Sequence, residues 1–400
     1  MKTVYKTALL VAGVSTMLNA SGYKIPEQSL RGLALGVANI AAVDGSDASY
    51  YNPANMAFMS EPRHELELGF TYIQLPSMTF EHAMSSAYNA NSKVEHFVLP
   101  YAHIVVPNFY ENWRYGFSLV VPGGLAKRWD GILGETYAKK FSLKIIEANP
   151  TAAYKINDHF ALGFGLRALY TDGIVTNNMY GGMAHRKLTG DSFDFGYNLA
   201  LSARPIEGLA LAATYRSKVD LTIEGNARAS VMGTEIYSGK ASVDAILPAT
   251  LSLATAYTYK DTTLEFVYEK TYWSKYKELD FNYSTPLPAV FDEPVYKGWK
   301  NSNAFRLGLT HKYSDDLTLM AGFAIDKSAA PDSTLSFELP DSDSKLYSGG
   351  FEYKINDDVS IGAAYVFTDK EKRKIDHDGV AGEFKDGFAH LATMTFKYRF

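Results

Sequence analysis

The chain of 400 residues contains no cysteine. That absence excludes a disulfide-stabilised scaffold and any cysteine-ligated zinc or iron–sulfur site. Basic residues are not in excess, because 39 Lys and Arg stand against 44 Asp and Glu for a formal net charge of −5. Since no run of Lys or Arg dominates the sequence, a protein that binds nucleic acid or another polyanion is not expected.

Long hydrophobic runs and catalytic motifs are also missing. Beyond residue 20, no stretch approaches the roughly 18 consecutive apolar positions of a membrane-spanning helix. His64-Glu65 lacks the second histidine of a zinc-protease motif, and there is no Gly-x-Ser-x-Gly elbow or P-loop. The 9 histidines show no metal-ligand spacing. We therefore expect no enzymatic activity, no metal and no cofactor.

The N-terminus has the three parts of a secretory signal peptide. Lys2 and Lys6 give a cationic start, residues 7–18 form a short apolar stretch, and Ala20 offers a small residue for cleavage. We predict that residues 1–20 are removed on export. The alternative is an N-terminal helix of a cytosolic fold.

Aromatic residues make up 14% of the chain, and many of them recur at every second position. At the C-terminus, one face of residues 388–400 carries Phe388, His390, Ala392, Met394, Phe396, Tyr398 and Phe400. The residues between them are polar, small or, once, leucine, which is the period of a two-faced strand. About fourteen such segments occur: 64–73, 95–106, 113–122, 141–156, 159–171, 192–204, 209–224, 240–259, 262–273, 303–313, 317–326, 345–355, 359–369 and 388–400.

Short and long connections alternate between these segments. Tight turns such as 157–158 alternate with the long connections 74–94, 123–140, 172–191, 225–239, 274–302, 327–344 and 370–387. An up-and-down transmembrane barrel gives this pattern, whereas a soluble β-sandwich has no reason to keep it. Segment lengths lie near the roughly 9–11 residues of a tilted membrane strand. We predict an all-β protein in which residues 63–400 form a 14-stranded antiparallel transmembrane β-barrel in the outer membrane of a Gram-negative cell.

Residues 21–62 do not alternate. Leu33, Val37 and Ile40 lie at helical spacing, and Asn52-Pro53-Ala54 has turn chemistry. A barrel of this strand number is wider than an eight-stranded one, whose side chains fill the interior. We therefore predict that the segment is an N-terminal hatch, or plug, inside the lumen.

Several motifs, spread in order over the mature chain, resemble those of the FadL-type long-chain fatty acid transporters. They are Glu27-Gln28-Ser29 with Gly32, Gly36 and Ala41-Ala42, then Asp47-Ala48-Ser49, Asn52-Pro53-Ala54, Val121–Ala126, Thr214–Val219, Leu247-Pro248-Ala249, Trp299-Lys300-Asn301 and Pro340-Asp341. The resemblance implies a hatch barrel that takes up long-chain fatty acids or similar hydrophobic molecules across the outer membrane. It also implies sideways release at an inward kink of the third strand, and a basic residue near the ligand headgroup at Lys300.

The sequence offers a physical cause for such a kink. Pro122 cannot donate to a sheet ladder, and Gly123 and Gly124 tolerate unusual backbone dihedrals. The other interpretation is that these residues are the top of the third strand as it enters a long loop. Pro100 raises the same problem in segment 95–106, where a local bulge is expected.

Binding residues are predicted from which face they occupy. For a ligand carboxylate the candidates are Lys300 and Arg306, then Arg216 and Arg167, with Lys218 also on a lumen-facing position. Alternatively, lumen cations pair with Asp194, Glu265, Glu269 or Glu352 and hold the interior together. Apolar hatch residues expected to line the pocket, or to attach the hatch to the wall, are Leu30, Leu33, Leu35, Val37, Ile40 and Phe58; Asn52, Pro53 and Ala54 would shape a turn.

The rival functions are an aromatic hydrocarbon channel of the same family and a general diffusion porin, followed by a barrel enzyme and an adhesin. A porin predicts no hatch, and an adhesin predicts much larger loops. The expected partners are outer-membrane lipids, the hydrophobic ligand and the barrel-assembly machinery, for which the terminal Phe400 resembles the recognition signal. We expect a monomer.

Overall fold

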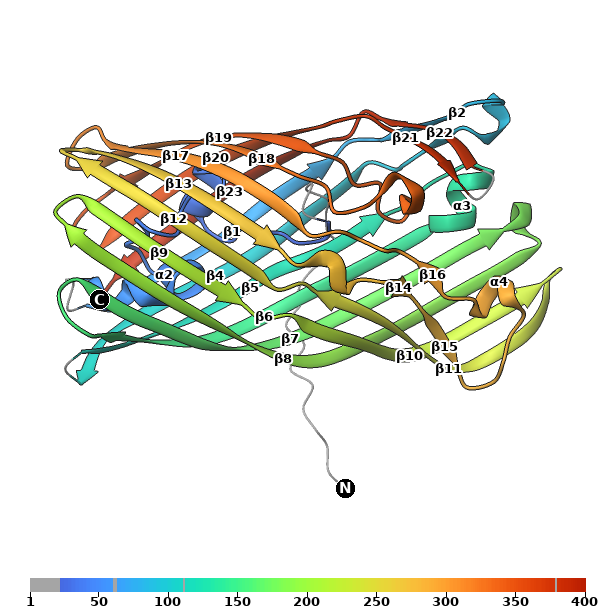
Figure 1. Cartoon of the computed structure of the whole chain (residues 1–400), viewed down its shortest axis with the longest axis horizontal. Coiled ribbons are helices and arrows are strands. Elements are labelled where there is room, and N and C mark those ends of the chain that lie inside the picture. Colours follow the sequence, from blue (N-terminus) through green and yellow to red (C-terminus); the bar gives the residue numbers. More distant parts are fainter. Residues whose placement is uncertain (1–21, 60–62, 111, 378–379) are drawn as a thin grey trace, which may run out of the picture.

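The computed structural model describes residues 22–59, 63–110, 112–377 and 380–400, and the predicted signal peptide lies outside these ranges. The described residues form a closed barrel of fourteen antiparallel strands around an N-terminal hatch (Figure 1). Each wall strand pairs with its neighbours along the chain, and β1 pairs with β23 from Glu65↔Arg399 to Gln74↔His390 to close the cylinder.

The wall strands are β1 (Glu65–Leu75), β4 (Glu95–Tyr110), β5 (Trp113–Lys127), β6 (Lys140–Lys155), β7 (Phe160–Met179), β8 (Ala184–Ile206), β9 continued by β10 (Leu209–Arg216, Val219–Val231), β11 continued by β12 (Thr234–Leu247, Thr250–Tyr259), β13 (Thr262–Thr271), β17 (Ser302–Lys312), β18 (Leu317–Asp326), β19 (Ser344–Lys354), β20 (Val359–Lys370) and β23 (Phe388–Arg399). Each of the fourteen predicted segments lies on one wall strand, so the predicted strand count is confirmed.

Two predicted long loops are wrong as loops. Segment 172–191 consists mostly of the ends of β7 and β8, and segment 225–239 mostly of the ends of β10 and β11. Their outward positions carry polar residues such as Asp172, Thr176 and Asn178. The lipid-facing pattern therefore ends although the strand pairing continues, and the two hairpins extend the wall beyond the apolar belt.

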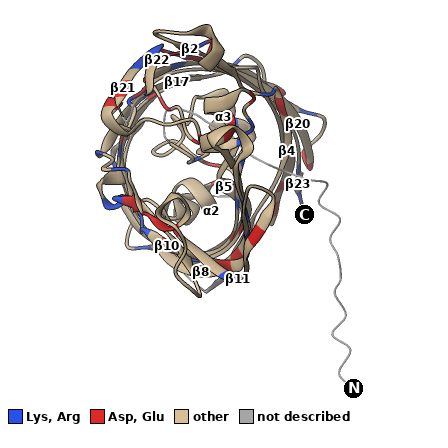
Figure 2. Cartoon of the chain, turned by 90° about the vertical axis from the view of Figure 1, so that its right-hand side faces the viewer, with Lys and Arg blue, Asp and Glu red and all other residues tan. Residues whose placement is uncertain are grey.

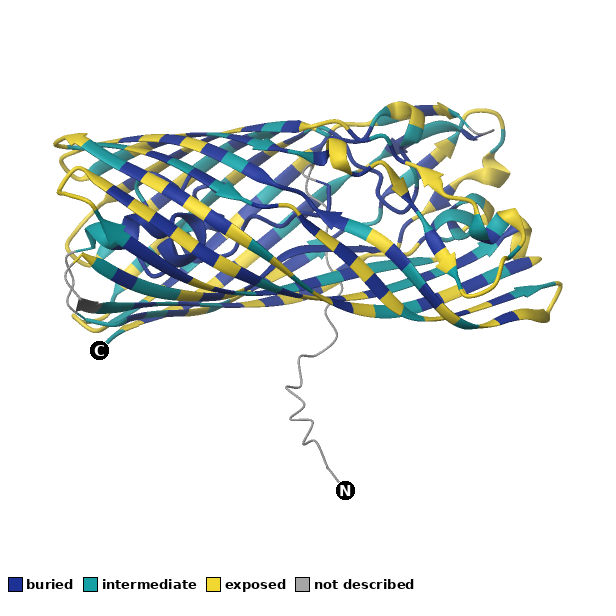
Figure 3. Ribbon diagram, turned by 60° about the horizontal axis from the view of Figure 1, so that its bottom comes forward, coloured by how far each residue is buried: buried dark blue, intermediate teal, exposed yellow. Residues whose placement is uncertain are grey.

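The outer face of the barrel is apolar. Figure 3 shows buried and exposed residues alternating along the wall strands. The exposed positions carry large hydrophobic side chains, among them Phe70, Phe195, Leu201, Leu307 and Phe396. Such a surface would be costly in water, and in a bilayer it contacts lipid while the strand hydrogen bonds stay paired. No helix in the described part of the chain is long and apolar enough to cross a membrane.

Long connections gather at one end of the cylinder. A small sheet in the order β21-β22-β2-β3 joins the first and last long connections, which are neighbours because β1 pairs with β23. Phe80 of this sheet packs on Phe337 and Phe384, each with ring centroids 4.8 Å away. Elements outside the wall and hatch are β2 (Thr79–His82), η2 (Ser86–Tyr88), β3 (Ala90–Asn91), α3 (Ile132–Ala138), η3 (Tyr180–Gly182), η4 (Trp273–Lys275), β14 (Glu278–Leu279), β15 (Phe281–Tyr283), α4 (Ala289–Asp292), β16 (Val295–Tyr296), η5 (Asp332–Thr334), β21 (Arg373–His377) and β22 (Val380–Lys385).

The hatch contains α1 (Leu30–Ala34), α2 (Ala48–Tyr51) and the 3₁₀-helix η1 (Pro53–Phe58), and the view along the barrel shows α2 inside the ring of strands (Figure 2). Ser29 caps α1 by accepting a hydrogen bond from the Gly32 amide. A Cβ on Gly32 would lie 2.0 Å from the Tyr51 hydroxyl, so glycine is required where the two hatch helices meet. The hatch is packed as a core rather than as a loose tail.

Candidate functional site

Strand β5 bends into the lumen at its middle. Side chains alternate as far as Leu119, and then every residue from Val120 to Lys127 is buried. β4 pairs with β5 only from Tyr110↔Trp113 to Ala102↔Leu119, and the register with β6 shifts between Val120 and Gly123. The predicted Pro122-Gly123-Gly124 segment therefore lies at an inward bulge within the strand, where its missing donor and small side chains are tolerated.

Where β5 is no longer paired with β4, the start of the hatch pairs with β5 instead. Lys24 forms an antiparallel bridge with Gly123, framed by Ile25 N to Pro122 O and Gly124 N to Tyr23 O, both 2.8 Å. The Gln28 side chain bonds both backbone groups of Val121, at 2.9 and 3.0 Å. The hatch entry is therefore joined to the kinked strand by backbone and side-chain hydrogen bonds.

A gap in strand pairing separates β4 from the kink. In the described residues, β4 from Glu95 to Tyr101 pairs with β1 and not with β5. Pro100 lies in this stretch, and a strand edge is where proline is tolerated, so no bulge is needed to explain it. The inward side chains Phe97 and Leu99 belong to one buried apolar cluster with Val120, Val121 and Ala126.

An apolar cavity lies beside the kink. Its lining is mainly aliphatic and aromatic and includes Tyr23, Leu125, Leu143, Ile223 and Trp299. Tyr23 packs edge-on against Trp273, with ring centroids 4.9 Å apart, and its hydroxyl bonds Ile246 O.

One ion pair interrupts the apolar lining. Lys297 pairs with Glu338, and their side chains are only 4% and 12% exposed. Burial alone would raise the pKa of Glu338, but the adjacent ammonium holds that pKa below its usual value. Both residues belong to long connections outside the wall strands. Lys297 was not predicted as a headgroup residue, although it lies three positions before Lys300.

A second cavity, which we call the polar cavity because charged residues stand among its apolar lining, lies on the other side of the hatch entry. Tyr23 lines the apolar cavity, whereas Lys24 and Pro122 line the polar one. Arg167 and Arg216 also line it, and both are ion-paired with Glu147 of β6. Sequence reasoning missed Glu147, although it is the single acid in predicted segment 141–156 and shares the inward face of Leu143 and Ile145.

The predicted cations separate into different environments. Lys300 is exposed and lines neither cavity. Arg306 is buried within the ion-pair set of Glu269 and Asp326, at 3.4 and 3.5 Å, and donates to Gly36 O. Lys218 faces outward beside Asp220, because the strand is interrupted between β9 and β10 and the alternation changes there.

The predicted hatch residues are mostly attached to the wall. Leu30 lies against Gly362, and Leu35 against Gly308 and Gly322. Leu33 is fully buried in the same cluster. Val37 and Ile40 line the polar cavity.

Phe58 lies instead under the Arg204 guanidinium, 4.4 Å from its ring centroid. Asn52 donates to Ile40 O and to the Ser202 hydroxyl, which fixes the turn. A Cβ on Gly163 of β7 would lie 2.3 Å from the Ala54 amide nitrogen and 2.7 Å from the Pro53 carbonyl carbon. The Asn52-Pro53-Ala54 turn is therefore seated directly against the barrel wall.

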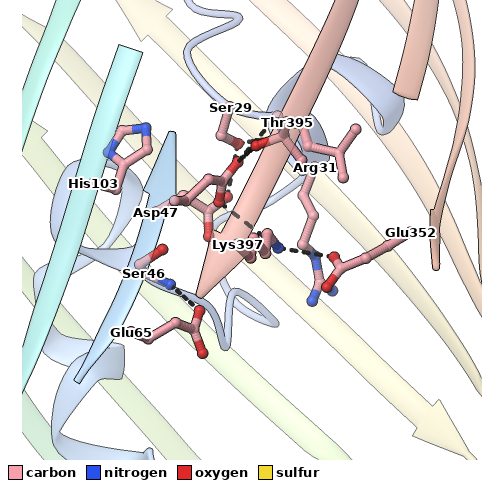
Figure 4. A network of polar contacts seen from close by, with 12 residues as sticks. Ser29, Arg31, Ser46, Asp47, Glu65, His103, Glu352, Thr395 and Lys397 are labelled. Atoms are coloured by element: carbon pink, nitrogen blue, oxygen red, sulfur yellow. Dashed lines mark hydrogen bonds and ion pairs between the residues drawn. The ribbon is translucent and has the colours of Figure 1, made fainter. Parts of the chain in front are cut away.

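Wall carboxylates hold the hatch by its backbone amides. Glu265 accepts from Ile40, Ala41 and Ala42 at 2.7, 2.6 and 3.2 Å. Figure 4 shows a second anchor, in which Glu65 accepts from the Ser46 amide at 2.7 Å while Lys397 pairs with Glu352 at 2.8 Å. Such charge-assisted bonds keep the hatch in one position.

Comparisons with known proteins agree with this architecture. Residues 11–400 match the family model described as "Outer membrane protein transport protein (OMPP1/FadL/TodX)". The chain is 25% identical to the long-chain fatty acid transport protein of Escherichia coli O6:H1, covering 98% of this chain and 97% of that one. It is 27% identical to the 47 kDa outer membrane protein of Pasteurella multocida, covering 100% and 98%.

Solved structures show the same fold. A Pseudomonas aeruginosa FadL homologue superposes with a TM-score of 0.83 at 19% identity, covering 94% of this chain and 99% of that one. The Pseudomonas putida toluene transporter TodX superposes at 0.73 and 17% identity, with the same shares. The family match over nearly the whole chain, together with the lipid-facing barrel, shows that this chain belongs to the OMPP1/FadL/TodX family of outer-membrane transport proteins.

Proposed function

We propose that this protein takes up long-chain fatty acids by binding them in the apolar cavity and releasing them sideways at the β5 kink. The observation that carries the proposal is an apolar cavity that contains one buried cation and includes Leu125, in the part of β5 that is not paired with β4. Each buried CH₂ contributes about 0.8 kcal/mol, so a tail of about sixteen carbons could gain roughly 10 kcal/mol, an upper bound because ordering the tail costs entropy.

Lys297 is the proposed headgroup residue. A carboxylate entering the cavity would compete with Glu338 for the ammonium, and the exchange would keep the lysine paired throughout. Long-chain fatty acid transport is also the activity named for the Escherichia coli relative.

Lateral release avoids a costly alternative. A tail that left the cavity into lumen water would lose the burial free energy it had gained. A tail released sideways into the membrane would stay buried, and the strand ends on the two sides of the gap contribute Phe97, Leu99 and Val121 to one apolar cluster. The hatch occupies the barrel lumen and packs against the wall strands, which argues against a route straight down the lumen and against a water-filled diffusion porin.

Aromatic hydrocarbons are the second candidate cargo. Tyr23, Trp273, Tyr276 and Trp299 form edge-to-face and tilted contacts beside the cavity, with centroids 4.8 to 6.5 Å apart. Such rings suit a flat aromatic ligand. A fatty acid could take the place of Glu338 beside Lys297, whereas a neutral ligand would leave this ion pair as it is.

The test is uptake by cells that lack their own fatty acid transporter. Radiolabelled oleate should enter when this protein is expressed, and labelled toluene and a small sugar serve as comparison solutes. Oleate uptake above the empty-vector rate supports the proposal. Toluene uptake without oleate uptake would replace it with the hydrocarbon function, and sugar uptake alone would replace it with a porin.

A further inference from the structure

The polar cavity carries one positive charge more than its ion pairs balance. Oε2 of Glu147 accepts from Nε and Nη2 of Arg167 at 3.0 and 2.8 Å, and its other oxygen is bound by Arg216. Two guanidinium groups, which stay charged, therefore share one carboxylate. A buried charge without a counterion is costly, so the trio favours an additional anion.

The other ionic groups around this cavity balance one another. Lys24 pairs with Glu269, and Arg306 lies between Glu269 and Asp326. Glu27 of the hatch, whose pKa burial raises to about 7, belongs to this second group, because the cations that act on it are Arg306 and Lys24. The excess charge is therefore located at the arginine pair.

Arg216 is the member of the trio that a ligand reaches. Its side chain is 17% exposed, whereas those of Arg167 and Glu147 are 2% and 0% exposed. It donates to Glu147 and, at 3.3 Å, to Tyr50 O, and its guanidinium carbon lies 4.3 Å from the Tyr50 ring centroid. These hydrogen bonds use two of its five N–H groups and leave the others for a ligand.

The cavity lies on the other side of the hatch entry from the apolar cavity. Lys24 and Pro122 line it, while the adjacent Tyr23 lines the apolar cavity. Glu147 is the register partner of Val120, the residue at which β5 begins to bend. A carboxylate that leaves Lys297 needs another cation, because an unpaired anion is strongly disfavoured in the protein interior.

We propose that the polar cavity is a second, anion-selective binding site in which Arg216 receives the carboxylate of the cargo. Arg167 is a positioning residue, because it holds Glu147 and donates to Ser217 O at 2.7 Å behind it. This inference rests on the proposed function, since a neutral cargo gains nothing from the site.

The test uses oleate labelled with ¹³C at the carboxyl carbon and the full-length protein in detergent. Wild type should give two bound carboxylate resonances. Arg216→Gln should lower the oleate affinity of the site behind one resonance by about tenfold or more, the usual effect of losing a charge-assisted hydrogen bond. Lys297→Gln with Glu338→Gln should lower the oleate affinity of the site behind the other resonance. Lys218→Gln is the matched control, because Lys218 lies two residues away but faces outward beside Asp220.

Further variants separate ligand binding from barrel integrity. Arg216→Lys keeps the charge and should retain the second resonance. Glu147→Gln increases the excess positive charge and should tighten oleate binding there. A loss in Glu147→Gln equal to that in Arg216→Gln would assign the trio a purely structural role and overturn the inference.

Uptake of oleate and oleyl alcohol separates the inference from the proposed function. Arg216→Gln should slow oleate uptake about tenfold and leave oleyl alcohol unchanged. A single wild-type resonance that only the Lys297 variant removes would overturn the second site and leave the proposed function standing. No bound resonance and no oleate uptake in wild type would overturn both.

Discussion

Lys24 of the hatch and Gly123 of β5 form an antiparallel bridge at the point where β5 is no longer paired with β4. The hatch is thus an extra partner for the interrupted strand as well as a plug. A change in the position of residues 23–28 would alter the hydrogen bonding of the kink directly. The hatch entry and the gap are therefore expected to respond together to mutation.

Gln28→Leu should loosen this junction. The substitution leaves the buried N–H and C=O of Val121 without their side-chain partner, which costs about 1–3 kcal/mol per unsatisfied group. Amide hydrogen exchange should accelerate at Ile25 and Gly124, and exchange in paired strands β12 and β13 is the internal control. Unchanged exchange at both amides would mean that Gln28 does not secure the hatch entry.

Gly163→Leu should dislodge the Asn52-Pro53-Ala54 turn. The new Cβ would lie 2.3 Å from the Ala54 nitrogen, a backbone atom that can give way only if the turn moves. Permeability to a small hydrophilic antibiotic should rise while the barrel stays folded by heat-modifiable gel mobility. Gly349→Ala is the matched control, since its nearest neighbour would be 3.6 Å away. Equal permeability in the two variants would contradict a tightly seated hatch.

Asp341 should make the long connection 327–343 sensitive to pH. Burial raises the pKa of its carboxyl to about 7, against the opposing effects of Lys370 at 3.8 Å and a hydrogen bond from Ser328. Because the pKa of Asp341 is higher in the folded state than in the unfolded state, its protonated carboxyl stabilises the folded connection fully below about pH 4. This contribution is lost as the pH rises through about 7.

Asp341→Asn imitates the protonated form and should remove this dependence. Hydrogen exchange in 327–343, corrected for its intrinsic rate, should increase from pH 5 to pH 9 in wild type and stay flat in the variant. Two further charges act on this carboxyl: Asp326 raises its pKa and Arg373 lowers it. A flat wild-type profile would show that Asp341 stays in one protonation state over this range.

Substitutions of Lys297 and Lys300 should have different effects on the binding of the ligand headgroup. Lys297→Gln with Glu338→Gln should weaken oleate binding about tenfold or more and leave oleyl alcohol binding unchanged. Lys300→Gln should change neither affinity, because Lys300 is exposed and outside both cavities. Fluorescence titration of the purified protein measures both. The reverse result would restore the sequence-based choice of Lys300.

Alternation predicted the wall because the period of a strand is local information. Phe388 to Phe400 shows its lipid face in the sequence itself, and so do the other thirteen segments. The hairpins beyond Asp172 and Gly225 were missed because outward positions above the apolar belt are polar. A rule that looks for apolar residues at every second position cannot find the parts of a strand that extend beyond the lipid.

The binding sites depend on contacts across the lumen, which no local pattern encodes. Glu147 meets Arg167 and Arg216 from three different strands, and Lys297 meets Glu338 from two separate connections. Alternation did place Arg167 and Arg306 inside, but it could not say that Arg306 is ion-paired with Glu269 and Asp326. Lys218 was misplaced because the interruption at Ser217 resets the alternation.

Closing the gap reversibly tests the central claim most directly. The native chain has no cysteine, so Phe97→Cys with Ala126→Cys gives one reactive pair on the two sides of the gap. A reducible bis-maleimide linking the two should stop oleate uptake, and reduction should restore it. A pair at Leu211 and Thr255, register partners in β9 and β12, should leave uptake unchanged when linked. Full uptake with the gap quantitatively linked would contradict lateral release.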